Sequence, residues 1–241
     1  MATVIKVAVV DSIATSPANP AMLFHLLRFS SPSLPIGGFA WSQGLESAIE
    51  LGWLKNEDDL HDWLLAMLEQ GFANQELPLL LRMLALDESA ERLDKLRYWN
   101  ARSLAMRESA ELRLEDVQTG RAFLQLALSM DIELAKSWPS DKEIGYLAAF
   151  ALACDHYKID FVAAATGFIW SWLDNQIAAA IKLFPLGQTS GQLLLERLAP
   201  VIPGVIETAA DLADDDIGIS LPGQVMASML HETQYSRMFR S

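Results

Sequence analysis

The clearest feature of the chain is the recurrence of apolar residues at intervals of three and four. After Asn56 the sequence runs NEDDLHDWLLAMLEQGF, and its large apolar residues are Leu60, Trp63, Leu64, Leu65, Met67, Leu68 and Phe72. Nearly all of these lie on one face of a helix. Asn56 is a favoured N-cap residue, and the three acidic residues after it stabilise the positive end of the helix dipole. The pattern predicts a helix over residues 56–72.

The same period predicts helices along most of the remaining chain. Ser140 and Glu143 have the spacing of a capping box, which marks the start of one of these helices. Further helices are expected over residues 76–86, 88–114, 116–130, 141–153, 189–198, 205–213 and 223–231. Strand signals are weak in comparison, so we expect an all-α fold.

The segment from about residue 161 to 184 differs from the other predicted helices because it is apolar on nearly every side. Its small residues are Ala163, Ala164, Ala165, Gly167, Ala178, Ala179 and Ala180. Helices of this kind are buried, and small residues let neighbouring helices approach closely. We therefore predict a single-domain bundle of roughly eight to ten helices around this central helix. The domain is expected to span residues 22–241, after a flexible leader at residues 1–21.

Charge and composition exclude several classes of function. The 241 residues include 18 Lys and Arg against 31 Asp and Glu, which gives a formal net charge of −13. Such an acidic chain is a poor ligand for nucleic acid or for anionic lipid. The single cysteine, Cys154, allows no disulfide within the chain. No long apolar segment indicates a membrane helix, so we expect a cytoplasmic protein without nucleic-acid or membrane partners.

The common catalytic and metal-binding motifs are absent from the sequence. It contains no Gly-Lys dipeptide, no HExxH and no Gly-x-Ser-x-Gly, so a P-loop, a zinc protease site and a nucleophile elbow are excluded. The candidate metal ligands are Cys154 with His156, and His231 near the C-terminus. Neither group supplies the three or four convergent ligands of a stable site, so we predict no metal site. The acidic residues between Arg197 and Arg237 are interpreted as a solvated face.

Two segments have residue types that a helical domain does not need for folding alone. The first, residues 30–46, is SSPSLPIGGFAWSQGLE, in which two prolines and two adjacent glycines indicate a rigid loop before a helix. The second is the C-terminus, HETQYSRMFRS, which places aromatic residues and methionine beside two arginines. This composition is typical of protein interfaces. The alternative is that the C-terminal segment packs on its own domain.

At these segments the sequence resembles the urease accessory protein UreF family. The resemblance rests on SPSLPIGGF and SQGLE near the N-terminus, on RES at 107–109 with GRA at 120–122, on WLDNQ at 172–176 with AIKLFPLGQ at 180–188, and on the C-terminal HETQYSRMFRS. The motifs occur in order from about residue 22 to the end of the chain.

The resemblance implies a non-enzymatic chaperone for the maturation of nickel urease. Members of the family are all-helical and form dimers. They bind the accessory protein UreD, called UreH in some organisms, and the GTPase UreG, and the assembly delivers nickel to apo-urease. Regulation of the GTPase and a nickel path through the complex are also implied. We accordingly expect no cofactor on the isolated chain.

The residues that we expect at partner interfaces lie in the motifs that carry the resemblance. They are Arg237, Tyr235, Phe239, Arg240, Lys182, Gln188, Phe39, Gln43 and Glu46. An arginine in an aromatic tail can make fork-like contacts with a carboxylate, although Arg237 could instead pair with the acidic segment of its own chain. Lys182 has the alternative of a structural ion pair, and Trp41 is expected in the core.

Two other classes of function stay open at this point. One is a helical enzyme of unfamiliar type, which would need a cleft with convergent titratable groups. The other is a nickel carrier that binds the metal itself through Cys154, His156 or His231. The sequence does not decide whether GTP hydrolysis by the partner is accelerated or slowed, nor which face forms the dimer.

Overall fold

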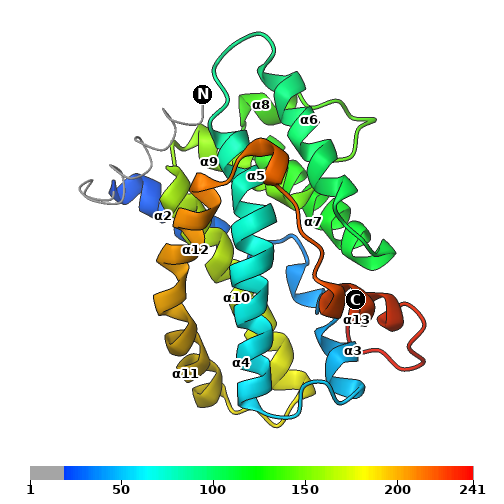
Figure 1. Cartoon of the computed structure of the whole chain (residues 1–241). Coiled ribbons are helices and arrows are strands. Elements are labelled where there is room, and N and C mark those ends of the chain that lie inside the picture. Colours follow the sequence, from blue (N-terminus) through cyan, green and yellow to red (C-terminus); the bar gives the residue numbers. More distant parts are fainter. Residues whose placement is uncertain (1–18, 241) are drawn as a thin grey trace.

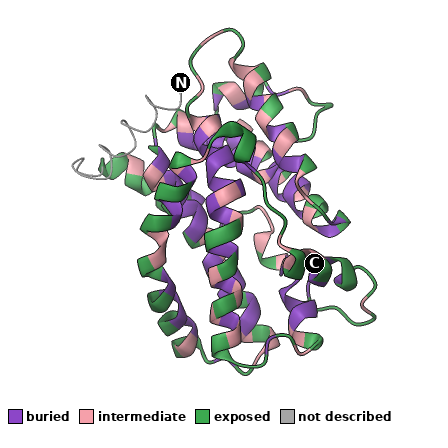
Figure 2. Ribbon diagram, in the orientation of Figure 1, coloured by how far each residue is buried: buried purple, intermediate pink, exposed green. Residues whose placement is uncertain are grey.

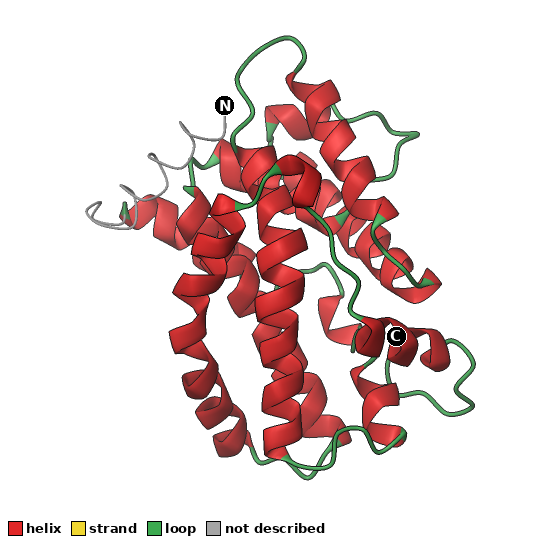
Figure 3. Cartoon of the chain, in the orientation of Figure 1, coloured by secondary structure: helices red, strands yellow, loops and turns green. Residues whose placement is uncertain are grey.

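The computed structural model describes residues 19–240, which form helices joined by turns and loops with no strand among them (Figures 1 and 3). The elements are α2 (Pro20–Phe29), η1 (Gly38–Ala40), α3 (Leu45–Glu50), α4 (Glu57–Ala66), η2 (Met67–Glu76), α5 (Leu77–Leu84), α6 (Arg92–Ala105), α7 (Ala110–Ser129), α8 (Glu133–Lys136), α9 (Tyr146–His156), α10 (Phe161–Leu183), α11 (Gln188–Leu198), η3 (Ala199–Val201), α12 (Ile202–Asp211), η4 (Asp214–Asp216) and α13 (Pro222–His231). The predicted all-α fold is confirmed. The buried side chains form one apolar core between the helices (Figure 2).

Helix α10 is the central element that the sequence predicts. It begins after Asp160, whose carboxylate accepts a hydrogen bond from the Ala163 N–H at 2.9 Å, and it ends before Pro185. Its buried small residues are Ala164, Ala165, Gly167, Ala179 and Ala180, whereas Ala163 is half-buried and Ala178 is exposed. The helix packs against α2, α3, α5, α11 and α12. A Cβ atom added at Gly167 would lie 2.5 Å from the Leu26 side chain of α2. The small residue is therefore what lets α2 cross α10 closely.

A long continuous helix, α4–η2–α5, runs through residues 57–84 beside the core (Figure 1). The predicted N-cap is confirmed, because the Asn56 Oδ1 accepts from the N–H groups of Asp58 and Asp59 at 2.9 Å. The break expected between residues 72 and 76 is wrong. The chain stays helical there through wider π-type turns, and the Asn74 amide donates to the Gln70 carbonyl at 2.9 Å.

Two predicted helix boundaries near the middle of the chain are wrong. The helix expected over residues 88–114 is interrupted after Ala105, and α7 begins after Ser109, whose hydroxyl accepts from the Leu112 N–H at 3.1 Å. The Ser140–Glu143 capping box starts no helix, and α9 begins only at Tyr146.

The start of α9 is fixed by side chains from other helices. Asp116 of α7 accepts a hydrogen bond from the Tyr146 N–H at 2.6 Å, and Asn100 of α6 accepts one from the Gly145 N–H at 2.8 Å. Glu143, which would have closed the capping box, instead pairs with Arg113 at 2.7 Å. These distant caps satisfy the first N–H groups of α9, so no local cap is needed.

The first helix of the described residues lies in a segment where the sequence patterns predict no helix. Helix α2 begins at Pro20, and the Asn19 Oδ1 accepts from the Ala21 N–H at 3.0 Å. Most of the predicted leader, residues 1–18, lies outside the described residues.

Candidate functional site

The C-terminal segment folds back onto the start of the chain. We call residues 232–240 the tail; this segment follows α13 and lies beside α3 (Figure 1). The backbone N–H groups of Met238 and Phe239 donate to the two oxygens of the Glu46 carboxylate at 2.6 and 2.8 Å. The Arg240 N–H donates to the Ala40 carbonyl at 2.8 Å. The tail is therefore fixed through its backbone by α3 and by η1.

Beneath the tail lie three buried side chains, Glu46, Glu111 and His231, and the exposed Arg237 joins them from the tail; we call these four residues the tail cluster. His231 is completely buried, with Nδ1 at 2.8 Å from Glu111 Oε2 and Nε2 at 3.1 Å from Glu46 Oε2. Arg237 donates from Nη1 to the other oxygen of Glu111 at 2.9 Å. Two carboxylates from α3 and α7 are thus matched by two basic side chains from α13 and the tail.

Two cation–π contacts extend this site at its edge. The ammonium of Lys182, at the end of α10, lies 5.4 Å from the centroid of the Phe239 ring. The guanidinium of Arg240 lies 4.9 Å from the centroid of the Trp41 ring. The Phe239 and Trp41 rings are both buried. The tail therefore places the Phe239 ring in the core and the Arg240 guanidinium over the Trp41 ring at the edge of the core. Trp41 in the core is as predicted.

The structure brings together five of the nine residues predicted at interfaces, namely Arg237, Phe239, Arg240, Lys182 and Glu46. Arg237 does form an ion pair within its own chain, but its partner is Glu111 of α7 and not a residue of the acidic segment. Lys182 is within cation–π distance of Phe239.

The remaining four predicted residues are placed differently. Tyr235 is fully exposed on the outside of the tail, and Phe39 is 66% exposed on η1. Gln43 points inward, because its amide donates to Glu115 at 2.9 Å and its carbonyl accepts from the Trp172 indole at 2.8 Å. Gln188 is the first residue of α11 and is exposed.

Close to the tail cluster lies a cavity of about 160 Å³, lined by η2, α7, α9 and α10. On its wall Arg107 pairs with Asp116 at 2.8 Å and, through Nη2, with Glu76 at 2.9 Å. Burial raises the pKa of Glu115 to about 8, although the hydrogen bond from Gln43 acts in the opposite direction. Sequence analysis missed this group of charges, and its one signal was the Arg-Glu-Ser motif at residues 107–109.

The residues considered as metal ligands do not form a metal site in the structure. Burial raises the pKa of the Cys154 thiol well above its ordinary value, while His156, two residues further along α9, is exposed. His231 uses its two nitrogens for two different carboxylates. No group of three potential ligands that could hold a metal ion occurs in the part of the chain that the structure describes.

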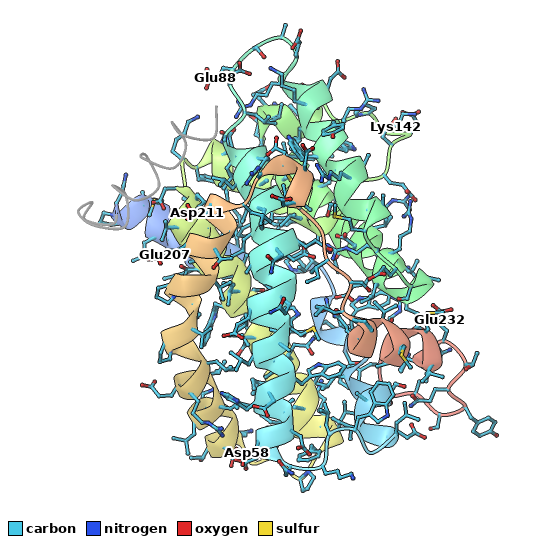
Figure 4. The ribbon with its side chains drawn as sticks, viewed as in Figure 1. Asp58, Glu88, Lys142, Glu207, Asp211 and Glu232 are labelled. Carbon is cyan, nitrogen blue, oxygen red and sulfur yellow. The ribbon has the colours of Figure 1, made fainter. Side chains whose placement is uncertain are left out.

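The acidic segment between Arg197 and Arg237 is only partly a solvated face. Glu207 and Asp211 lie at the surface of α12 (Figure 4). Asp214 instead pairs with Arg82 at 2.9 Å, and the Asp214 carbonyl accepts from Arg102 at 2.8 Å. These arginines hold η4 against the helices, so part of the negative charge is neutralised within the chain.

Fold and site together define an all-α protein that displays an ordered C-terminal segment on a helical framework. The UreF family model matches residues 54–199. The chain is 43% identical over 222 residues to the urease accessory protein UreF of Hahella chejuensis, which covers 92% of this chain and 99% of that protein. It is 44% identical over 227 residues to that of Chromohalobacter salexigens, with 94% and 97% covered.

The chain belongs to the UreF family of urease accessory proteins, as its motifs predicted. It is therefore an accessory protein and not an enzyme, which removes the alternative of an unfamiliar helical enzyme. None of the described helices combines the length and the apolar character needed to cross a membrane.

Proposed function

We propose that the chain acts in the cytoplasm as a chaperone for nickel insertion into urease. In this proposal it forms a homodimer, binds UreD/UreH and the GTPase UreG, and brings them to apo-urease. The observation that carries the proposal is the ordered tail. Because its polar groups are largely satisfied within the chain, its exposed apolar side chains remain available to a partner.

These exposed side chains continue onto helix α13. Met226, Met229 and Leu230 lie at three- and four-residue spacing on one face of α13, and each is about half exposed. Tyr235 and Met238 add exposed apolar area on the tail. Apolar groups of this kind, rimmed by arginine, are typical of protein interfaces.

The test separates direct contact from support of the tail. Tyr235→Ala removes a side chain that is fully exposed, so it should weaken co-purification with UreD/UreH or UreG at unchanged thermal stability. Tyr98→Ala, at an exposed tyrosine on α6, is the matched control and should bind as wild type. Urease activation in a strain lacking its own UreF should follow the same order. Full binding and activation by Tyr235→Ala would contradict the proposed surface.

We assign the homodimer interface to a second apolar surface, formed by α2 and α10. Leu23, Phe24 and Leu27 are 41%, 65% and 62% exposed on α2, and Trp170 is 44% exposed on α10, one turn after the crossing at Gly167. Phe24→Asp should give a monomer in light scattering after size exclusion. Leu193→Asp, at an exposed leucine of α11, should leave the dimer intact. A dimer that survives Phe24→Asp would refute the assignment.

Nickel is proposed to pass through the assembled complex rather than to rest on this chain alone. The buried thiol of Cys154 and the fully engaged ring of His231 support this proposal. Equilibrium dialysis of the isolated chain against micromolar nickel should give no stoichiometric binding. Stoichiometric binding would favour the nickel-carrier alternative.

We further propose that the chain regulates GTP hydrolysis by UreG, because it binds UreG and UreD/UreH in the same complex. GTP hydrolysis by UreG, measured with UreD/UreH alone and then with the wild-type chain added, should change in rate. An unchanged rate in a complex that forms completely would remove the regulatory role and leave the scaffold.

A further inference from the structure

The cavity between η2, α7, α9 and α10 lies apart from the surfaces assigned to protein partners. Its volume is about 160 Å³. A cavity of about 150 Å³ engineered in another protein holds one benzene molecule, so a ligand of about six non-hydrogen atoms has the right size. Glu108 and Ile219 belong to the lining and are exposed, so a ligand can enter from the surface between them.

Acidic side chains outnumber basic ones on the wall of this cavity. Glu76, Glu115 and Asp116 are each no more than 9% exposed, and Arg107 is the one basic residue among the described residues that line the cavity. The Arg107 guanidinium donates to both Asp116 and Glu76. One positive charge therefore already faces two carboxylates, and none is left to pair with Glu115.

One oxygen of Glu115 also lacks a hydrogen-bond partner. The Gln43 amide donates to Oε1 at 2.9 Å, whereas Oε2 is buried and has no hydrogen bond within the part of the chain that the structure describes. Buried polar atoms are nearly always hydrogen-bonded in folded proteins, so an exception indicates a site that another molecule completes. A ligand with N–H donors would supply the missing bond.

Four aromatic rings form another part of the wall. The Phe72 ring centroid lies 4.9 Å from that of Trp172 and 5.8 Å from that of Phe168, and the Phe168 centroid lies 5.5 Å from that of Tyr146. Aromatic rings attract organic cations and pack against their carbon chains, but they offer no ligand to a metal ion. No group of three potential metal ligands occurs among the described residues, so the chemistry of the wall favours an organic cation over a metal ion.

We propose that this cavity is a binding site for a small organic cation, a primary alkylammonium of about six non-hydrogen atoms, with Glu115 as its counter-ion. The ammonium donates to Oε2 of Glu115, and the alkyl chain packs on the rings of Phe72, Phe168 and Trp172. The site lies within one chain, so it does not depend on the proposed function of the tail.

Binding of the cation releases the proton of Glu115. Burial raises the pKa of this side chain to about 8; among the charged groups around it, Asp116 and Glu76 act in the same direction and Arg107 acts against them. Tyr146 stays neutral, because burial raises its pKa as well. Alkylammonium groups lose a proton only near pH ~10, as lysine does, so the ligand keeps its charge and the carboxyl proton passes to the solvent. Affinity should therefore rise by up to about tenfold per unit from pH 6 to 8.

Titration of the wild-type chain with butylammonium chloride in the millimolar range, followed by ¹H–¹⁵N NMR, tests the site. The reporter is the indole N–H of Trp172, which donates to Gln43 at 2.8 Å and is joined through Gln43 to Glu115. The signal is identified by its loss in Trp172→Phe. It should shift to saturation at pH 8, and the dissociation constant should be larger at pH 6. 1-Butanol has as many non-hydrogen atoms as butylammonium but no charge, so it should give no saturable shift.

Two matched variants separate the counter-ion from a general effect of charge. Glu115→Gln keeps an acceptor for Gln43 but cannot ionise, so it should raise the dissociation constant at pH 8 by about tenfold or more and remove the pH dependence. Glu69→Gln removes an exposed carboxylate of η2 that lies outside the lining, and it should bind as the wild type does. Unchanged binding by Glu115→Gln would overturn the proposal, as would an equal response to 1-butanol or the absence of a saturable shift in the wild type.

Discussion

Replacing Glu115 by glutamine should make the stability of the protein less dependent on pH. The Glu115 side chain is buried on α7, and burial raises its pKa from 4.5 to about 8, against the opposing effects of the Gln43 hydrogen bond and of Arg107. At neutral pH the folded protein therefore keeps a proton that this side chain loses on unfolding. Glutamine has nearly the same shape, carries no charge and keeps an acceptor for Gln43.

The sign and size of the effect follow from linkage between protonation and folding. Between pH 4.5 and about 8 the folded state holds one proton more than the unfolded state at this site, so the free energy of unfolding falls as pH rises. The slope is ~1.4 kcal/mol per pH unit for one proton, and the whole interval amounts to at most ~5 kcal/mol. Below and above this interval the site contributes no slope.

Urea unfolding at pH 5, 6, 7 and 8 measures the effect. The stability of Glu115→Gln should rise relative to the wild type by ~1.4 kcal/mol with each pH unit. Glu108→Gln is the matched control on the same cavity, because Glu108 is exposed and accepts the Ser220 hydroxyl at 3.0 Å. Its profile should run parallel to the wild type. Parallel profiles of wild type and Glu115→Gln would refute the assignment of a protonated, buried Glu115.

Two further substitutions test the packing of the site. Glu46→Ala removes the acceptor of two tail N–H groups and should lower stability by about 3 kcal/mol in chemical denaturation, against under 1 kcal/mol for Glu232→Ala at the exposed end of the tail. An equal loss in both would contradict the tail cluster. Gly120→Ala places a Cβ 2.3 Å from the Ile144 carbonyl oxygen and should lower the free energy of unfolding by about 3 kcal/mol. Its control, Gly204→Ala, meets open space and should be neutral or stabilising by ~1 kcal/mol. Similar shifts of the melting temperature in both variants would count against the α7–α9 contact.

Sequence patterns predicted those parts of the fold whose causes are local. The start of α4 depends on Asn56, and this prediction is confirmed. The predicted burial of α10 through its small residues is confirmed except at Ala163, which is half-buried, and at Ala178, which is exposed. The start of α9 depends on Asp116 and Asn100, which are 30 and 45 residues away from the N–H groups that they cap. Hydrophobic periodicity and capping motifs depend only on residues that are close in sequence, so they predicted the start of α9 at the Ser140 capping box.

The residues of the candidate site could likewise be predicted where local sequence motifs mark them, but not where they depend on distant contacts. The composition of the tail and its motifs pointed to Arg237, Phe239 and Glu46, and the structure brings these residues together. Glu111 was missed because a carboxylate near the start of a helix has a sufficient local explanation in the helix dipole. Its two ion pairs join positions 120 and 126 residues apart, and no local pattern indicates such a pairing.

The tail cluster and the cavity are neighbours on the same two elements. On α7, Glu111 faces the tail, and Glu115, one turn later, faces the cavity. Gln43, just before α3, bonds to Glu115, and Glu46 of α3 bonds to His231 and to the tail. Each element thus contributes one side chain to the tail and one to the cavity. Because α7 is one continuous helix, it holds Glu111 and Glu115 at a fixed spacing, so the tail cluster and the cavity share one rigid support.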